Sequence, residues 1–163
     1  MKVEEAIRNR RSIRRYKRET PKHSDIEKIL QAGIWAPSGL NNQPWKFKIL
    51  KNGDGKNSIA RFTKYGDVIR AAPVVICVFL DKKASYDRDK DILAIGACIQ
   101  NIILTAYEPG LASCWLGEIL KRKRELRKHL GISPNYELMA VVALGYPDET
   151  EISERKELDE FLL

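Results

Sequence analysis

The segment from Asp91 to Glu108 constrains the fold more than any other part of this sequence. Its apolar residues, mostly isoleucines, recur at three- and four-residue steps and leave almost no polar face. A helix that is apolar on nearly every side has to be covered by other elements on several sides. We therefore expect residues 91–108 to form the longest helix and to lie at the centre of the fold.

Several other segments predict strands. PVVICVFLD at 73–81 and ELMAVVALGY at 137–146 are apolar almost without a break, which is typical of strands buried on both faces of a sheet. KFKILK at 46–51 alternates and predicts a further strand, whereas residues 110–119 predict a loop or a short strand. Together with the central helix, these segments predict an α+β fold.

Shorter helices are expected at 2–9, 25–35, 57–65 and 121–130. Ser24 and Glu27 have the S-x-x-E spacing of a capping box, which places the start of the second helix near residue 25. NGDG at 52–55 predicts a turn. Because neither a repeat nor a linker interrupts the chain, we expect residues 1–163 to form a single domain.

Two classes of protein fit this sequence poorly. The longest apolar run, AAPVVICVFL at 71–80, is well short of the roughly 20 residues that a membrane-spanning helix needs. The segment MKVEEAIRNRRS carries charge where a signal peptide has its apolar stretch. We therefore expect a cytoplasmic protein that has no contact with a membrane.

Cysteine and histidine are sparse. The three cysteines form no CxxC pair, and the two histidines belong to no HExxH motif. Cysteines within apolar runs behave as small buried hydrophobic residues. We expect free thiols and no metal site.

Positive charge is concentrated near the N-terminus. The whole chain has a formal net charge of +7, and residues 1–18 alone hold eight Lys or Arg against two Glu. A protein that coats nucleic acid usually spreads its positive charge along one face, whereas a tight cluster suits a single phosphate group. The cluster consists of Arg10, Arg11, Ser12, Arg14 and Arg15. Ile13 and Tyr16 within it favour a packed segment over a solvated basic stretch, which remains the alternative.

Two loops have the composition of a binding site. APSGLNNQPW at 36–45 carries three consecutive carboxamides, which suit a ligand edge that alternates donors and acceptors, or a row of hydroxyls. GLASCWLG at 110–117 has a glycine at each end, which lets a backbone approach a flat ring closely. The alternatives are an ordinary helix-ending loop and a buried turn. Neither GxGxxG, a P-loop nor a GxSxG elbow occurs, so a glycine-rich phosphate cradle and a serine nucleophile are not expected.

Five motifs occur together in a fixed order. They are RRSIRRY, APSGLNNQPWKF, GACIQNIILTAYEPG, GLASCWLGEI and VVALGYPDE. In this order the chain resembles the nitroreductase family of FMN-dependent oxidoreductases. The resemblance implies a central mixed β-sheet wrapped by helices, in an intertwined homodimer with FMN at the interface.

The resemblance also implies a set of cofactor-binding residues. Arg10, Ser12 and Arg14, with Arg11 beside them, match the family's residues at the phosphate and the flavin. Pro37, Ser38, Gly39 and Asn41 match the loop that reaches the flavin from the partner subunit. Trp115, Leu116 and Gly117 match the segment along one flavin face, and Arg155 matches a C-terminal basic residue at the phosphate. Arg61 and Lys64 are candidates for the mid-chain contacts, and Glu118 stands where the family usually has glycine.

The activity implied by the resemblance is a two-step, ping-pong electron transfer. NADH or NADPH would reduce the flavin at N5, and a small electron-poor acceptor, such as a nitroaromatic compound or a quinone, would reoxidise it. Arg14 and the Gly117 backbone would support the flavin, and no catalytic side chain or metal is needed. The alternatives are a dehalogenase-like or flavin-consuming enzyme of the same fold and, outside that fold, a small basic module that binds nucleic acid.

Overall fold

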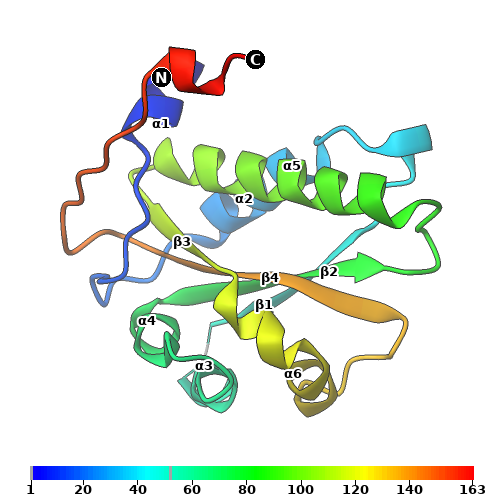
Figure 1. Cartoon of the computed structure of the whole chain (residues 1–163). Coiled ribbons are helices and arrows are strands. Elements are labelled where there is room, and N and C mark those ends of the chain that lie inside the picture. The colour runs from blue at the N-terminus through cyan, green and yellow to red at the C-terminus, as the bar shows by residue number, and fades with distance from the viewer. Residues whose placement is uncertain (1, 52) are drawn as a thin grey trace.

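A four-stranded sheet forms the middle layer of the molecule (Figure 1). The structure is a computed structural model that describes residues 2–51 and 53–163. The strands are β1 (Trp45–Leu50), β2 (Val74–Asp81), β3 (Ala112–Leu116) and β4 (Tyr136–Gly145), in the order β1-β2-β4-β3. The two continuously apolar strands, β2 and β4, therefore occupy the interior of the sheet, as expected.

The resemblance implied a mixed sheet, and the strand pairing within one chain corrects this expectation. Each of the four strands is antiparallel to its neighbours. β2 and β3 do run in the same direction, as expected for a strand–helix–strand unit, but β4 inserts between them and makes both direct pairings antiparallel. Parallel pairing between described residues is limited to the isolated bridge between Ser12 and Ser113.

Helices cover both faces of the sheet (Figure 1). One face carries α5 (Arg88–Tyr107) and α2 (His23–Ile34), and the other carries α3 (Gly53–Ala60), α4 (Gly66–Ala71) and α6 (Lys123–His129). Alternate residues of the inner strands supply the two cores, because successive side chains of a strand point to opposite faces. Ile76 and Val142 pack on the α5 side, whereas Cys77 and Val141 pack on the α6 side.

Helix α5 confirms the expectation of a long, central, buried helix. It spans 20 residues and begins at Arg88, three residues before the predicted start. The reason for the earlier start is the Asp87 side chain, which accepts a hydrogen bond from Lys90 N and caps the helix. Helix α1 (Val3–Asn9) also lies where the sequence predicted it, and α6 ends before Gly131, whose φ of +66° suits glycine.

Two local predictions were wrong. Helix α2 begins at His23, so Ser24 lies inside the helix and caps nothing. A helix from Gly53 replaces the turn predicted for 52–55, of which residue 52 lies outside the described residues. Tertiary contacts override the turn propensity here, since Ile59 is fully buried and the Lys56 ammonium donates to Ala72 O.

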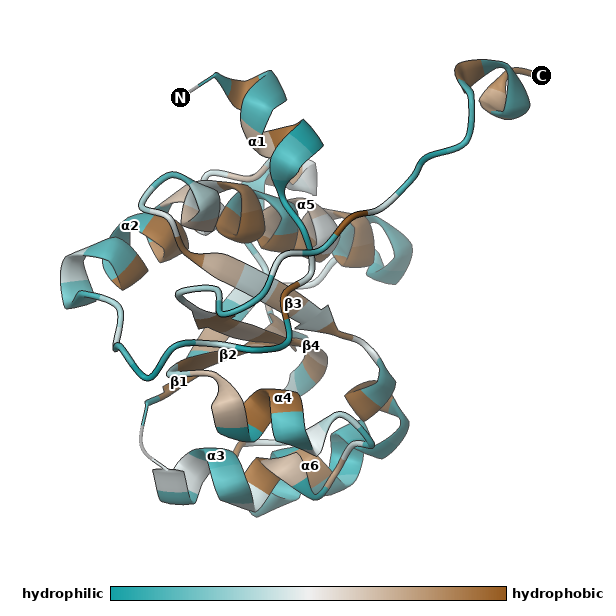
Figure 2. Ribbon diagram, turned by 90° about the vertical axis from the view of Figure 1, so that its left-hand side faces the viewer, coloured by the Kyte–Doolittle hydropathy of each residue, from teal (hydrophilic) through white to brown (hydrophobic). Residues whose placement is uncertain are grey.

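The C-terminal segment leaves the body of the molecule as an arm (Figure 2). Residues 151–163 are all exposed, and they end in a short 3₁₀ helix, η3 (Leu158–Phe161). This helix is amphipathic, and Phe161 is 64% exposed. Within the described ranges, no helix is both long enough and apolar enough to cross a membrane.

Candidate functional site

The basic N-terminal segment is packed along the free edge of β3. Ser12 forms a parallel bridge with Ser113, and Ile13 N donates to Ser113 O at 3.0 Å. Ile13 and Tyr16 are buried in the core under the sheet. The expectation that apolar residues within the cluster make it a packed segment is confirmed, and Arg10, Ser12 and Arg14 are held at fixed places beside β3.

Glu149 fixes the turn of this segment, and the sequence analysis gave it no role although the motif VVALGYPDE ends on it. Its carboxylate accepts hydrogen bonds from Arg14 N at 2.6 Å, Arg15 N at 3.1 Å and Arg15 Nε at 2.9 Å. The bond from the Arg14 amide is the main cause that lowers the pKa of Glu149 below its usual range. Arg15 is thereby neutralised, whereas the Arg14 guanidinium donates, among the described residues, to Ser12 O alone, at 3.2 Å.

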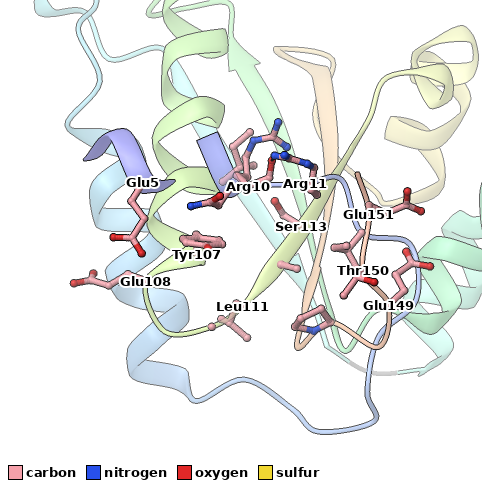
Figure 3. Close-up of a pocket in the computed structure, with 16 residues that line it drawn as sticks. Glu5, Arg10, Arg11, Tyr107, Glu108, Leu111, Ser113, Glu149, Thr150 and Glu151 are labelled. Atoms are coloured by element: carbon pink, nitrogen blue, oxygen red, sulfur yellow. The ribbon is translucent and has the colours of Figure 1, made fainter. Parts of the chain in front are cut away.

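Arg10 and Arg11 form one wall of a cavity of about 530 Å³ (Figure 3). Ser113 lies beside them, while Tyr107 and Glu108 stand on the opposite side. The Arg10 guanidinium meets no protein acceptor among residues 2–51 and 53–163. Burial lowers the pKa of Arg10, and the neighbouring charges of Arg155 and Arg11 lower it further.

These arginines fit a phosphate group. Arg11 Nη1 donates to Arg8 O and Arg10 O, but its Nε is buried and has no partner in the described part of the chain. A buried guanidinium N–H without an acceptor is rare and costly. A dianionic phosphate provides acceptors for the unpaired N–H groups and balances the like charges, so the donor set is that of a phosphate site. Arg155 lies on the C-terminal arm, where it donates to Ser153 Oγ and Glu154 O.

The carboxamide loop has an unusual backbone. Leu40, Asn41 and Gln43 all have positive φ, between 47° and 54°, a region that residues other than glycine seldom adopt. The side chain of Asn42 holds the loop by donating to Asp91 Oδ1 at 2.7 Å and to Ala84 O at 3.0 Å. The composition of the loop predicted its irregularity, but not the part that Asp91 plays in it.

Asp91 is fully buried at the start of α5 and anchors this loop. It also accepts hydrogen bonds from Ser85 Oγ at 2.6 Å and Tyr86 N at 3.1 Å. Burial alone would raise the pKa of Asp91, but the hydrogen bonds from Ser85 and Asn42 lower it below its usual range. Gly39 lies directly against Tyr86, because a Cβ at this position would overlap the Tyr86 hydroxyl unless that side chain moved.

The two groups of predicted residues lie at opposite ends of α5. Pro37 and Ser38 lie against Leu93 and Ala97 near its start, whereas the arginine cavity includes Tyr107 at its end. Leu93 and Tyr107 are 14 residues apart on α5, which is about 21 Å along the helix. One chain therefore does not bring the loop and the arginine cluster together.

Trp115 and Leu116 end β3, which is an edge strand, and Gly117 follows them. Trp115 is 43% exposed, but Leu116 is only 4% exposed and packs in the core. Of Leu116, only the backbone is available to a ligand. A Cβ at Gly117 would meet no protein atom within 4 Å, so the side-chain position there is open.

The two mid-chain candidates, Arg61 and Lys64, have different surroundings in the structure. Glu118 accepts hydrogen bonds from Thr63 Oγ1 at 2.6 Å and Lys64 N at 3.2 Å, which places Lys64 next to Gly117. The bond from Thr63 is the main cause that lowers the pKa of Glu118. Arg61 turns toward His129, with 3.1 Å between Nη2 and Nδ1. Lys64 is thus the better placed candidate.

The sequence matches the family described as the Nitroreductase family over residues 7–65 and 60–146. The chain belongs to the nitroreductase family. Its resemblance in five ordered motifs is thereby confirmed, and so is an α+β fold with a central sheet wrapped by helices, which the similar solved nitroreductase shares.

Similar nitroreductases come from distant organisms. A protein of Archaeoglobus fulgidus, provisionally named NADH dehydrogenase/NAD(P)H nitroreductase, is 38% identical over 152 residues, which cover 91% of this chain and 87% of that protein. A provisionally named nitroreductase from Desulfovibrio desulfuricans, crystallised in complex with FMN, is 42% identical with a TM-score of 0.97, and the match covers 100% of this chain and 96% of that one. Iodotyrosine deiodinase of Thermotoga neapolitana is 28% identical over 167 residues, 87% of each chain.

Proposed function

We propose that this nitroreductase-family chain is an FMN-dependent oxidoreductase, which takes electrons from NADH or NADPH and passes them to a small electron-poor acceptor in a ping-pong sequence. The observation that carries the proposal is the pair Arg10 and Arg11, whose unpaired N–H groups stand beside a cavity at the position of the family's phosphate residues. The FMN complex of the 42% identical relative supports it. Three free, buried cysteines are in keeping with action in the cytoplasm.

The residues of the chain would bind and orient the cofactor. Arg10, Arg11 and Ser12 hold the phosphate, with Arg155 approaching from the arm. Arg14 supplies positive charge for the negative charge of a reduced flavin ring. Trp115 and Gly117 offer an exposed edge of β3 to one face of the ring, with the Leu116 backbone between them. When bound, FMN supplies the reversible two-electron chemistry at N5, which the side chains of the protein do not provide.

We further propose that the functional unit is a homodimer. The carboxamide loop lies against the first half of α5 and the arginine cluster lies at its other end, so Ser38, Gly39 and Asn41 would reach the cofactor from a second copy. Leu40 is 85% exposed in that loop, and Trp35 at the end of α2 is 83% exposed. Exposed apolar side chains of this size are typical of a surface that another chain covers.

The C-terminal arm supports the same proposal. It extends beyond the body of its own chain and ends in an amphipathic helix (Figure 2). An extended segment whose apolar residues stay exposed in its own chain is suited to pack against a second copy of the chain. A dimer would therefore bury the arm, the loop and the exposed end of α2 together.

A dehalogenase of the same fold is the second candidate, because iodotyrosine deiodinase of Thermotoga neapolitana is among the relatives. Both candidates require FMN but differ in the acceptor. Anaerobic stopped-flow spectroscopy separates them. NADH or NADPH should bleach the flavin of the purified protein, and a nitroaromatic compound or a quinone should restore the oxidised spectrum in one mixing step. A colourless protein that takes up no FMN would contradict the proposal, and reoxidation by an iodinated phenol alone would favour the dehalogenase.

A further inference from the structure

A second cavity, of about 520 Å³, lies at the far end of the sheet, between α6 and the start of β4. Pro134, Tyr136 and Leu138 form part of its wall. Tyr136 stands six residues before Val142, the partner of Trp115 in the sheet. At about 3.3 Å per residue along a strand, the cavity is about 20 Å from the proposed flavin edge.

Positive side chains surround this cavity. They are Lys82, Arg88, Lys123, Arg124, Arg127 and Lys128, and they face one carboxylate, Glu137. We call these six residues the basic cavity. The two oxygens of Glu137 accept bonds from Arg88 at 3.0 and 3.1 Å and from Lys123 at 2.5 Å. These bonds keep the pKa of Glu137 below its usual range despite partial burial, which alone would raise it.

Glu137 leaves most of this positive charge without a counter-ion. Arg127 donates to Ile132 O. The side chains of Lys82, Arg124 and Lys128 donate to no acceptor within the parts of the chain that the structure describes. One carboxylate neutralises one charge, so the cavity wall carries a surplus of positive charge that a bound anion would neutralise.

The cations that line this cavity come from more than one element, so the dipole of α6 alone does not explain their placement. Arg127 and Lys128 lie in the last turn of α6, where the helix dipole favours cations. Lys82 follows β2, however, and Arg88 opens α5, where the dipole disfavours a cation. Three separate elements thus direct positive charge into the same cavity, which is not expected of cations placed only for solubility.

We propose that the basic cavity binds a small anion that carries two or more phosphate groups. Guanidinium groups bind phosphate oxygens in pairs, and lysines add point charges for further oxygens. The cavity has the volume of an ordinary small-molecule site. A concave site at one end of the sheet suits a compact anion better than a nucleic acid strand, which needs a continuous basic face.

Isothermal titration with inorganic tripolyphosphate tests this proposal. The protein is first saturated with FMN, so that the phosphate site at Arg10 is occupied. We expect one tripolyphosphate per chain, with monophosphate binding at least 10-fold more weakly. Arg124→Ala combined with Lys128→Ala should weaken tripolyphosphate binding at least 10-fold and leave the flavin content unchanged.

The matched control removes the same charge elsewhere. Lys22→Ala combined with Lys48→Ala takes two exposed lysines, one just before α2 and one from β1, and should change the affinity less than twofold. Arg124→Lys should retain most of the binding, since it keeps the charge. Equal losses in the control and the cavity variant would overturn the proposal in favour of a general charge effect. Unchanged binding in the cavity variant, or tighter binding of a single-stranded oligonucleotide than of tripolyphosphate, would also overturn it.

Discussion

Arg14 and Arg15 are neighbours in the sequence, yet the fold uses their side chains differently. The Arg15 guanidinium pairs with Glu149, whereas Arg14 bonds only to a backbone oxygen nearby. Sequence reasoning could identify the basic cluster, because five residues of suitable type stand together. It could not tell which cations the protein neutralises itself, because Glu149 comes from a segment 134 residues away.

The unpaired arginines give a prediction for cofactor affinity. Arg10→Ala should weaken FMN binding by about 1.5–3 kcal/mol, the usual range for a hydrogen bond to a charged group. Titration of the apoprotein, followed by flavin fluorescence, measures this loss. Arg18→Ala is the control, because this exposed residue lies outside the cavity. This variant should bind FMN with the affinity of the wild type. Full flavin content in Arg10→Ala after dialysis would contradict the assignment.

Gly117 gives a prediction for the rate of flavin reduction. Its φ of −90° is open to any residue, and an added side chain meets no protein atom within 4 Å. Gly117→Val should therefore fold normally but crowd the flavin face, so that both half-reactions become slower while the phosphate end still binds. Stopped-flow bleaching, normalised to bound flavin, measures the effect. A reduction rate equal to that of the wild type would place the ring elsewhere.

At the scale of elements, periodicity predicted most of what the structure contains. The central helix and the two inner strands were recognisable because burial on several sides demands long apolar patterns. The capping box at Ser24 and the turn at 52–55 were wrong because both rested on local preference alone. For the helix that replaces the turn, a contact outside the helix, that of Lys56 with Ala72, supports the observed structure.

The contact between Asp91 and the carboxamide loop gives a prediction about that element. Asp91→Asn should lower the free energy of unfolding at pH 7 by about 1–3 kcal/mol, because it removes the charge that several buried donors require. It should also weaken FMN binding if the loop completes the site. Ser85→Ala removes one of these donors and should cost less. Urea unfolding and flavin titration report the two effects separately.

The same contact sets a pH dependence. The pKa of Asp91 is lowered in the folded protein, so its contribution to stability is present above the ordinary carboxyl pKa of about 4 and is lost as the pH falls toward the lower, folded value. The stability difference between the wild type and Asp91→Asn should therefore shrink below about pH 4. A difference that stays constant down to pH 2.5 would contradict this role.

At the scale of the whole molecule, the sequence predicted the residues of the candidate site but not their separation. Ser38 and Arg10 appear as parts of one site only through the family resemblance. Nothing in their spacing shows that α5 separates them, and that separation is the reason why we propose a second copy. The antiparallel pairing of the strands could not be predicted from the sequence either, because the insertion of β4 between β2 and β3 is a property of the topology.

If two copies share each site, FMN binding and dimerisation are linked, because the cofactor binds the assembled state. Sedimentation should show a species of about twice the 18.7 kDa chain, whose dissociation is reduced by added FMN. Removal of residues 151–163 should weaken this dimer and the flavin affinity together. A monomer that holds FMN as tightly as the dimer would contradict the linkage.

The central claim, that each flavin site takes its arginines from one copy and its loop from the other, is tested most directly with hybrid dimers. One chain carries Arg10→Ala and Arg11→Ala, and the other carries Asn41→Asp, which tolerates the positive φ of this position. Each variant alone should bind FMN weakly at both sites. In the purified hybrid, one site combines the intact arginines of one chain with the intact loop of the other. We therefore predict one FMN per dimer with wild-type affinity. Weak binding at both sites of the hybrid would contradict the claim, because it would mean that the arginines and the loop act from the same chain.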